Sequence, residues 1–342
     1  MRVAMYYANN DVRLEEMAKP VIGDGELLVR IEASGICGSD VMEWYRIHRV
    51  PLVLGHEIAG IVVEAGKGVT RFKTGDRVAV AHHVPCGECR YCAAGHETVC
   101  DTLRKTNFDP GGFCEYVRVP GINVEKGVFP LPDNVSFEDA TFIEPLACVL
   151  RGQRRANLKE GDTVLIIGSG ISGLLHIKAA RSNAAGRIFA TDISNFRLDA
   201  AKRAGADYAI NAKEYGPEKL RKLNGGYLAD LVIICASAES AFEQALRSVE
   251  RGGTVLIFSA AGKDASLPVS TNDIFWRSEV TVTSSYAGSP QDHLDALDKI
   301  CLEKISVYDM ITHRLALRET GLGFRLVSEA KESIKVIIEP QK

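Results

Sequence analysis

Short apolar stretches separated by glycine-containing turns make up the first 145 residues or so. Residues 26–32, 58–64 and 77–81 alternate between apolar and polar positions and are rich in Val and Ile. Alternation with a period of two is typical of strands that are buried on one face. The first part of the chain is therefore predicted to be β-rich.

From about residue 151 the pattern changes to an apolar strand, a glycine turn and an amphipathic helix, repeated. This order predicts βαβ units around a parallel sheet that is covered on both faces. The tail has a helical pattern at 293–305 and a strand at 334–339, and the pattern does not decide which domain the tail joins. The units consist of strands at 163–167, 187–191, 231–235 and 254–258, and helices at 173–181, 197–204 and 240–249.

Length and composition indicate a soluble protein of two domains. The chain has 342 residues, and a single core usually stops growing near about 250–300 residues. A hydrophobic content of 46% excludes intrinsic disorder, and a net charge of −3 gives no reason to expect nucleic acid or an anionic membrane as partner. The sequence lacks both an apolar run of about 18 residues and an apolar signal segment, so we expect a cytoplasmic location.

A glycine motif follows the first strand of the βαβ region and opens a helix. Gly168, Gly170 and Gly173 form G-x-G-x-x-G, and Asp192 ends the next strand. In this context the motif is typical of dinucleotide binding, and the carboxylate favours NAD over NADP. Arg197 leaves NADP open, because arginine accepts a 2′-phosphate, and a tight turn without ligand is the remaining interpretation.

Four of the nine cysteines crowd into one loop with the spacing C-x2-C-x2-C-x7-C. Four thiolates in one lobe suit a closed tetrahedral zinc site of structural type. An iron–sulfur site is less well matched, because the ferredoxin run ends in C-x3-C-P. A redox site needs only two cysteines, whereas this loop has four. The four cysteines are Cys86, Cys89, Cys92 and Cys100.

Three further segments each offer one potential metal ligand. A lone cysteine or histidine is more often a structural residue, so each segment alone is weak support. Together they supply a thiolate, an imidazole and a carboxylate, and three protein ligands plus water is the arrangement of a catalytic zinc. The segments are Cys37-Gly-Ser39-Asp40, Gly55-His56-Glu57 and Glu144-Pro145-Leu146.

These motifs, in this order, resemble the zinc-dependent medium-chain alcohol/polyol dehydrogenase family over essentially the whole chain. Glu144 stands where simple alcohol dehydrogenases have a cysteine, which resembles the sorbitol-dehydrogenase-like branch. The resemblance implies a GroES-like β-barrel catalytic domain at 1–150 with a structural-zinc lobe at about 86–100. It also implies a Rossmann domain at 151–287, a return to the catalytic domain at 288–342, and a homodimer or homotetramer.

The resemblance also assigns roles and two zinc ions per chain. Cys37, His56 and Glu144 are the expected ligands of the catalytic zinc, and the four clustered cysteines are those of the structural zinc. Glu57 would approach the metal when water leaves, Asp40 would hold the free ring nitrogen of His56, and Ser39 would take the substrate's proton. The expected NAD contacts are Gly168, Gly170, Ile171, Gly173, Asp192 and Arg197.

The chain departs from the family at Met42, where many members carry a histidine that passes the proton to solvent. His82 falls on a position that lines the substrate pocket, and a polar wall there favours a polyhydroxylated substrate. The alternative is that His82 and His83 form a surface pair on a loop. Trp44 and Phe113 are further candidates for lining the pocket, although core packing is the more frequent role of such residues.

The function expected from these observations is hydride transfer between a secondary alcohol of a polyol, sugar or cyclitol and NAD(H). An amino alcohol, either L-threonine or an aminocyclitol, is an alternative substrate. A nucleotide-binding regulator and a zinc-free reductase relative are alternatives from other classes, and both lack the three-ligand set. A small-molecule substrate is the expected partner.

Overall fold

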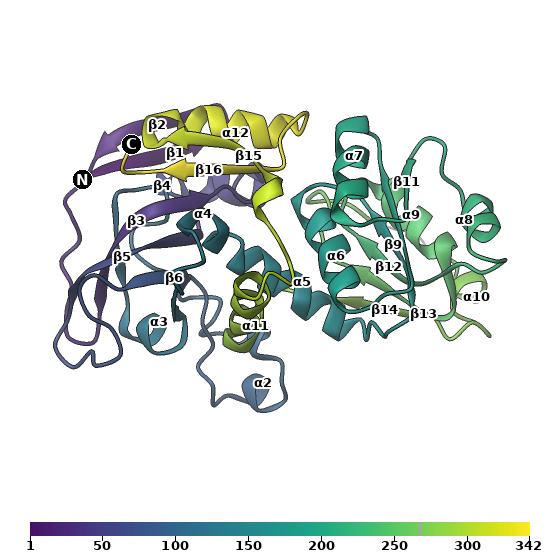
Figure 1. Cartoon of the computed structure of the whole chain (residues 1–342), viewed down its shortest axis with the longest axis horizontal. Coiled ribbons are helices and arrows are strands. Elements are labelled where there is room, and N and C mark those ends of the chain that lie inside the picture. The colour runs from purple at the N-terminus through teal and green to yellow at the C-terminus, as the bar shows by residue number, and fades with distance from the viewer. Residues whose placement is uncertain (267–268) are drawn as a thin grey trace. The chain divides into compact units, whose positions relative to one another are not determined.

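The computed structural model describes residues 1–266 and 269–342 and divides the chain into two compact units. Unit 1 comprises Met1–Ala147 together with Ala287–Lys342, and unit 2 comprises Cys148–Tyr286. The last strand, β16 (Lys335–Glu339), pairs antiparallel with β3 (Leu27–Gly35), and Ile337 lies opposite Gly35. The C-terminal segment therefore belongs to the sheet of the N-terminal unit (Figure 1).

Unit 1 is built on two sheets. The larger has the strand order β15-β16-β3-β5-β6-β8, with β7 also paired to β3, and the smaller has the order β2-β1-β4. Alternating apolar positions from both sheets meet in one core. Besides β3 and β16, the strands are β1 (Arg2–Ala8), β2 (Asp11–Glu16), β4 (Leu52–Val53), β5 (Glu57–Ala65), β6 (Arg77–Ala81), β7 (Tyr116–Val119), β8 (Val128–Pro130) and β15 (Ile311–Ala316).

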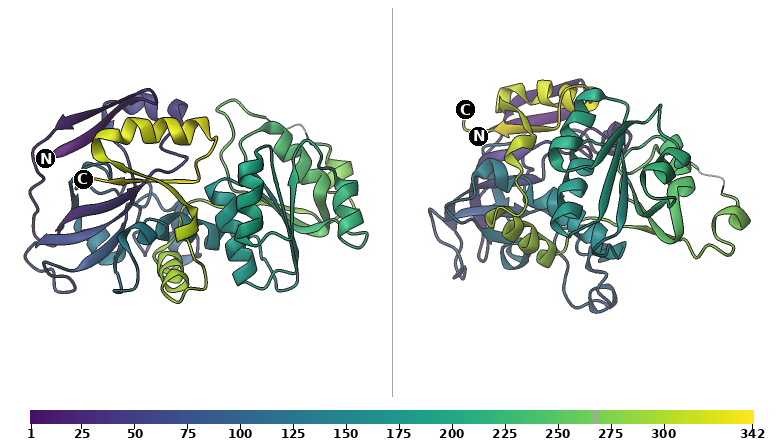
Figure 2. Two further views of the ribbon diagram at one scale, coloured as in Figure 1. Left: turned by 45° about the horizontal axis from the view of Figure 1, so that its top comes forward. Right: turned by 45° about the vertical axis from the view of Figure 1, so that its right-hand side comes forward.

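The helices of unit 1 are short, apart from two in the C-terminal segment. The helix α12 packs against β16 and β2, so the two ends of the chain share one side of the unit (Figure 2). The helices are α1 (Glu43–Arg46), α2 (Arg90–Ala93), α3 (Gly121–Lys126), α4 (Phe137–Ala140), α11 (Pro290–Cys301) and α12 (Thr320–Glu329), with 3-10 turns η1 (Ile47–Arg49), η2 (Glu97–Val99), η3 (Tyr308–Met310) and η4 (Leu317–Glu319).

Unit 2 has a six-stranded parallel sheet with the order β11-β10-β9-β12-β13-β14. This is the doubly wound order 3-2-1-4-5-6, and it confirms the parallel sheet predicted from the βαβ pattern. The strands are β9 (Thr163–Ile167), β10 (Arg187–Asp192), β11 (Tyr208–Asn211), β12 (Ala229–Ile234), β13 (Val249–Ile257) and β14 (Thr281–Ser284).

Helices cover both faces of this sheet (Figure 1). The helix α5 (Ile143–Arg155) begins in unit 1 and continues into unit 2. All five side chains of β9 are buried, as expected for a strand with helices on both sides. The other helices of unit 2 are α6 (Ile171–Ser182), α7 (Asn195–Ala204), α8 (Pro217–Leu223), α9 (Glu239–Ser248) and α10 (Thr271–Ile274).

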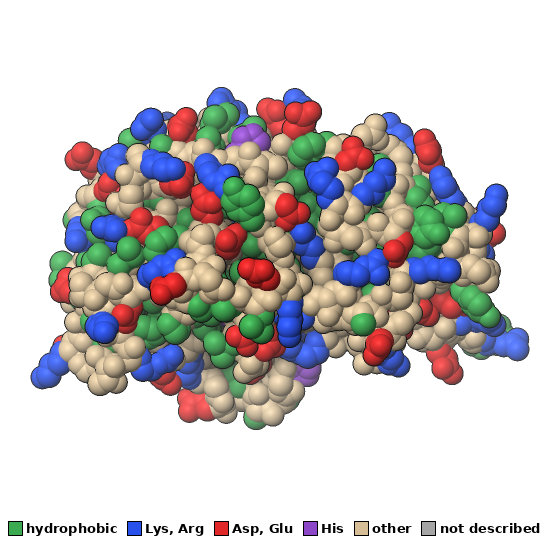
Figure 3. Space-filling model, in the orientation of Figure 1, with side chains coloured by type: hydrophobic (Ala, Val, Ile, Leu, Met, Phe, Trp, Pro, Cys, Tyr) green, Lys and Arg blue, Asp and Glu red, His purple; other side chains and the backbone are tan. Residues whose placement is uncertain are grey.

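The surface carries both signs of charge, interspersed over the face that Figure 3 shows. This mixed surface agrees with the net charge of −3. Within the described residues, no helix has the length and apolar character needed to cross a membrane.

Candidate active site and metal centres

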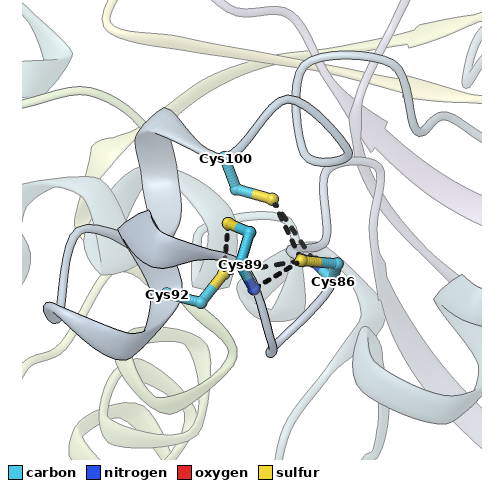
Figure 4. A group of neighbouring side chains, drawn as sticks. All are labelled: Cys86, Cys89, Cys92 and Cys100. Atoms are coloured by element: carbon cyan, nitrogen blue, oxygen red, sulfur yellow. Dashed lines mark hydrogen bonds between the residues drawn. The ribbon is translucent and has the colours of Figure 1, made fainter.

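The four clustered cysteines converge in unit 1, on the loop that carries α2 and η2. Their sulfur atoms all lie within 4.8 Å of one another, and the side chains point toward a common centre (Figure 4). Individual Sγ–Sγ distances are 3.6 Å for Cys86–Cys100, 3.6 Å for Cys89–Cys92 and 3.9 Å for Cys86–Cys92. Gly87 and Gly95 have positive φ, which lets the loop fold back.

The thiols of this lobe differ in how easily they ionise. Burial opposes ionisation of the Cys100 thiol, but hydrogen bonds from backbone N–H groups, beginning with that of Cys86, outweigh it and lower its pKa to about 6. Burial raises the pKa of the Cys92 thiol to about 12. Zinc binds thiolates and displaces their protons, and four sulfur donors around one centre fit a closed tetrahedral zinc site. The lobe therefore has the donor set of a structural zinc.

A second group of potential ligands lies where β3 ends and β5 begins. One ligand atom from each of Cys37, His56 and Glu57 lies within 4.8 Å of the other two. The antiparallel pairing of β3 with β5 puts Gly35 opposite Glu57, which brings the turn after β3 beside the start of β5. A thiolate, an imidazole and a carboxylate in one place fit a zinc ion with a position left for a further ligand.

The imidazole of His56 is held by a buried carboxylate. The Oδ1 atom of Asp40 lies 3.3 Å from Nδ1 of His56, and Oδ2 of Asp40 accepts a hydrogen bond of 3.0 Å from the backbone N–H of Cys37. Burial alone disfavours a charged His56, but Asp40 and Cys37 outweigh it and hold the pKa of His56 well above its usual value. A carboxylate on Nδ1 leaves Nε2 as the nitrogen that faces a metal.

Ser39 lies directly beside this group. Its hydroxyl donates to Sγ of Cys37 over 3.4 Å, and its oxygen accepts from Nη2 of Arg46 over 3.3 Å. Met42 caps the N-terminus of α1 without a side-chain hydrogen bond. Arg46 carries no motif signal, so the sequence analysis missed its contact with Ser39.

Glu57 makes a deeply buried ion pair with a lysine of the last strand. Its Oε2 atom pairs with Nζ of Lys335 on β16, and the two side chains are 1% and 0% exposed. A Cβ atom at Gly35 would lie 2.4 Å from both of these charged atoms, so the pair requires glycine there. The Lys335 ammonium also lies 5.3 Å from the centre of the Phe142 ring. Sequence reasoning missed this lysine, which stands 278 positions from Glu57.

Glu144 occupies the first turn of α5, in unit 1, and is half-buried. The group of three converging ligand atoms consists of Cys37, His56 and Glu57. As the third ligand of a catalytic zinc, Glu144 stays a prediction.

His82 and His83 follow β6 and extend the line of rings that begins at His56. Ring centres are 4.7 Å apart for His56–His82 and 3.9 Å apart for His82–His83. Nδ1 of His82 is buried and has no hydrogen-bond partner, and burial holds the pKa of His82 well below its usual value. Burial also lowers the pKa of His83 to about 4, although its Nδ1 contacts the backbone oxygen of Thr106. Both rings therefore present neutral polar atoms beside the metal group.

The two aromatic candidates lie in different surroundings. Phe113 is 1% exposed and packs in the core, with its ring 5.8 Å from that of Phe324. This burial favours the packing role for Phe113. Trp44 on α1 is 41% exposed and packs edge-on against Tyr45, so its ring stays accessible to a solute.

The glycine turn of unit 2 joins β9 to α6. Gly168 has φ +94°, and a Cβ at Gly173 would lie 2.0 Å from the backbone oxygen of Gly168. Only glycine at these positions permits the turn and the close packing of the helix start, and the helix N-terminus so formed is a site for pyrophosphate. Ile171 is the first residue of α6.

Asp192, at the end of β10, is tied to the same turn. Its two oxygens accept from the backbone N–H groups of Ser169, at 2.8 Å, and Ser194, at 2.9 Å. The guanidinium of Arg197 lies over Gly170, with Nη1 3.8 Å from the position of a Cβ there, and its Nε is buried without a partner. A buried donor beside a phosphate-binding turn fits a dinucleotide.

Fold and site together define a class: a zinc-binding oxidoreductase with a separate dinucleotide-binding unit. The comparisons with known proteins agree. The alcohol dehydrogenase GroES-like domain family matches residues 23–133, and the zinc-binding dehydrogenase family matches residues 172–301. A sorbitol dehydrogenase of Halalkalibacterium halodurans is 31% identical over 335 residues, which cover 96% of this chain and 95% of that protein.

Solved structures show the same likeness. Galactitol-1-phosphate dehydrogenase from Escherichia coli has a TM-score of 0.88 at 29% identity, with 99% of this chain and 100% of that chain covered. A putative zinc-binding dehydrogenase from Sinorhizobium meliloti, bound to NADP, has a TM-score of 0.87 at 29% identity, with 99% of both chains covered. This chain belongs to the zinc-dependent medium-chain alcohol/polyol dehydrogenases.

This membership confirms the predicted GroES-like and Rossmann folds and the prediction of a zinc-dependent alcohol/polyol dehydrogenase that acts on a small molecule. The comparisons do not favour the amino-alcohol alternative, nor the zinc-free and non-catalytic alternatives.

Proposed function

We propose that the protein transfers a hydride between a secondary alcohol carbon of a polyol, sugar or cyclitol and NAD(H). The observation that carries the proposal is the convergence of Cys37 and His56 beside the hydroxyl of Ser39. The neutral rings of His82 and His83 lie next to this group and offer hydrogen-bonding atoms to a substrate rich in hydroxyls. The similarity to sorbitol and galactitol-1-phosphate dehydrogenases supports a polyol substrate.

The zinc ligands in this proposal are Cys37, His56 and Glu144. Glu57 forms an ion pair with Lys335 and is not a ligand in the resting site. Its carboxylate approaches the metal when water leaves. When bound, zinc supplies a Lewis acid that favours loss of the alcohol's proton, and NAD supplies the hydride acceptor. Asp40 fixes the tautomer of His56, and Ser39 accepts the proton of the substrate hydroxyl as its own hydroxyl proton passes to water.

The cofactor is held by the turn of unit 2. The backbone of Gly168, Gly170 and Gly173 admits the pyrophosphate at the start of α6, with Ile171 beside it. Asp192 favours NAD because a carboxylate repels a 2′-phosphate. NADP is the second candidate, because the guanidinium of Arg197 lies over the same turn and a relative of 29% identity was solved with NADP.

The experiment that tests the function is a substrate panel with both cofactors. Sorbitol, xylitol and inositols are each supplied with NAD or NADP, and formation of the reduced nicotinamide is followed by its absorbance. We expect turnover of at least one polyol, with higher kcat/KM for NAD. Oxidation of L-threonine without oxidation of any polyol would contradict the proposal.

The metal assignment has its own test. We expect about two zinc ions per chain, one in each of the two sites. Cys37→Ser and Glu144→Gln each lower the content to about one zinc and abolish turnover. Glu160→Gln, at an exposed carboxylate outside both metal groups, is the matched control and keeps two zinc ions. If Glu144→Gln also kept two zinc ions and full turnover, Glu144 would not be a ligand.

We also propose that the protein is a cytoplasmic homodimer or homotetramer joined through unit 2, with residues 1–150 and 288–342 as the catalytic domain and 151–287 as the NAD domain. The last strand in the sheet order, β14, is an edge with Val282 40% exposed, and Trp276 nearby is 68% exposed. Such edges are places where a second chain adds a strand. Light scattering of the purified protein and of Val282→Pro tests this, with a shift toward monomer expected for the variant.

A further inference from the structure

A cation, Arg46, lies beside the metal group and contacts Ser39. Arg46 ends α1 and its side chain is 15% exposed. Its Nε donates to the backbone oxygen of Ser39 over 3.1 Å, and its Nη2 donates to Oγ of the same serine over 3.3 Å. The planar guanidinium therefore bonds to both the main chain and the side chain of Ser39, and we call this pair of hydrogen bonds the grip of Arg46.

This grip restricts the hydroxyl of Ser39. A guanidinium only donates hydrogen bonds, so the hydroxyl proton of Ser39 cannot point toward Arg46. The hydroxyl instead donates to Sγ of Cys37 over 3.4 Å. Arg46 thus occupies one lone pair of Oγ and turns the proton and the other lone pair toward the metal-binding side.

The same guanidinium lies next to the carboxylate that holds His56. Nη2 of Arg46 is 3.9 Å from Oδ1 of Asp40, which is fully buried and itself 3.3 Å from Nδ1 of His56. The backbone N–H of Arg46 donates to the backbone oxygen of Met42, one helical turn earlier, over 3.2 Å. The turn 37–40 and the helix after it are therefore fastened to each other at the site.

We propose that Arg46 is a positioning residue that sets the rotamer of Ser39 and aims its hydroxyl at the oxygen of the substrate. The proposal rests on the proposed function, because it takes Ser39 to meet the substrate hydroxyl. A hydroxyl without this grip rotates among its staggered positions, and only one of them faces the substrate. Misplacing a reacting group by about 1 Å can cost 10²-fold in rate.

Kinetics of four variants test the proposal. Arg46→Gln removes both the charge and the planar pair of N–H donors. Arg46→Lys keeps the charge but loses that pair of donors, and Ser39→Ala removes the hydroxyl that Nη2 bonds to. Arg49→Gln is the matched control, since its guanidinium lies 5.4 Å from the centre of the Tyr45 ring that Arg46 also contacts, at 4.8 Å. We expect kcat of Arg46→Gln to fall about 10- to 100-fold with KM nearly unchanged, and Arg46→Lys to recover only part of it.

The double variant Ser39→Ala/Arg46→Gln separates positioning from general support of the fold. If Arg46 acts through Ser39, the double variant is about as slow as Ser39→Ala alone, because the second change has nothing left to disturb. Multiplicative effects would overturn the proposal, and so would a wild-type kcat for Arg46→Gln. Loss of one zinc ion from Arg46→Gln while Ser39→Ala keeps two would also overturn it, since Arg46 would then support the ligands.

A readout without turnover keeps this inference separate from the proposed function. In a crystal structure of Arg46→Gln, we expect the Ser39 side chain to leave the rotamer in which Oγ faces Sγ of Cys37. An unchanged rotamer would contradict the role of Arg46 even in an active enzyme. A wild-type protein that oxidises no polyol would instead contradict the proposed function, and the rotamer would still report on Arg46.

Discussion

His176, in the core of unit 2, shows how burial alone sets a residue's chemistry. It is 0% exposed, its Nε2 has no hydrogen-bond partner, and its ring packs edge-on 4.5 Å from Phe258. Burial disfavours the charged imidazolium and lowers the pKa of His176 to about 3, from an ordinary 6.5. The folded protein therefore holds this ring neutral at any pH near neutrality.

This histidine makes unit 2 sensitive to acid. Between pH 6.5 and about 3 the unfolded chain binds a proton at His176 that the folded chain does not. The contribution of the neutral His176 to the free energy of unfolding is therefore fully present above pH 6.5. It is lost as the pH is lowered, by up to about 1.4 kcal/mol per pH unit from this one group. We expect His176→Leu to lose less stability than wild type when urea unfolding is measured at neutral pH and near pH 5. His48→Leu, on the exposed turn η1, is the control and should keep the wild-type slope.

At the scale of elements, the turn from β9 to α6 contains glycines with different physical roles. A Cβ at Gly173 would lie 2.0 Å from the backbone oxygen of Gly168, so any side chain there pushes α6 off the strand. A Cβ at Gly170 meets nothing nearer than Nη1 of Arg197 at 3.8 Å, which is an ordinary contact. The fold therefore tolerates a side chain at Gly170 but not at Gly173.

This difference predicts opposite behaviour of two alanine variants. Gly173→Ala should lower the melting temperature, because the start of α6 must move. Gly170→Ala should melt like wild type but bind NADH at least about tenfold more weakly, because the added methyl stands where the backbone approaches the pyrophosphate. Thermal melting and NADH fluorescence titration measure the two effects. Wild-type NADH affinity in Gly170→Ala would mean that the turn does not bind the dinucleotide.

At the scale of the whole molecule, the end of the chain completes the site at its beginning. Lys335 on β16 pairs with Glu57 at the start of β5, and both side chains are fully buried. The pairing of β16 with β3 places the lysine there, beside Gly35. A buried charge without its partner is costly, so the last strand stabilises the region of the metal ligands as well as the sheet.

Breaking this pair should destabilise the protein strongly. We expect Lys335→Met to lower the free energy of unfolding by about 3–5 kcal/mol, because it leaves the Glu57 carboxylate buried and unpaired. Glu57→Gln/Lys335→Met should regain much of that loss, since neither charge remains. Urea unfolding of the two variants decides the point. Equal free energies of unfolding of Lys335→Met and wild type would show that the ion pair does not stabilise the fold.

Much of this protein was predictable from local signals. The strand at 163–167, the glycine turn and the four-cysteine loop each lie within a short stretch, so periodicity and spacing report them directly. Arg46 and Lys335 had no such signal, because their roles depend on which side chain faces them. The sequence by itself determined the two folds, the four-sulfur lobe and the family. Only the tertiary structure decided that Arg46 bonds to Ser39, because a long side chain seven residues away can reach several partners and the sequence does not say which. The pairing of Lys335 with Glu57 was likewise decided by the tertiary structure, because β3–β5 and β3–β16 pairing joins residues far apart in the chain.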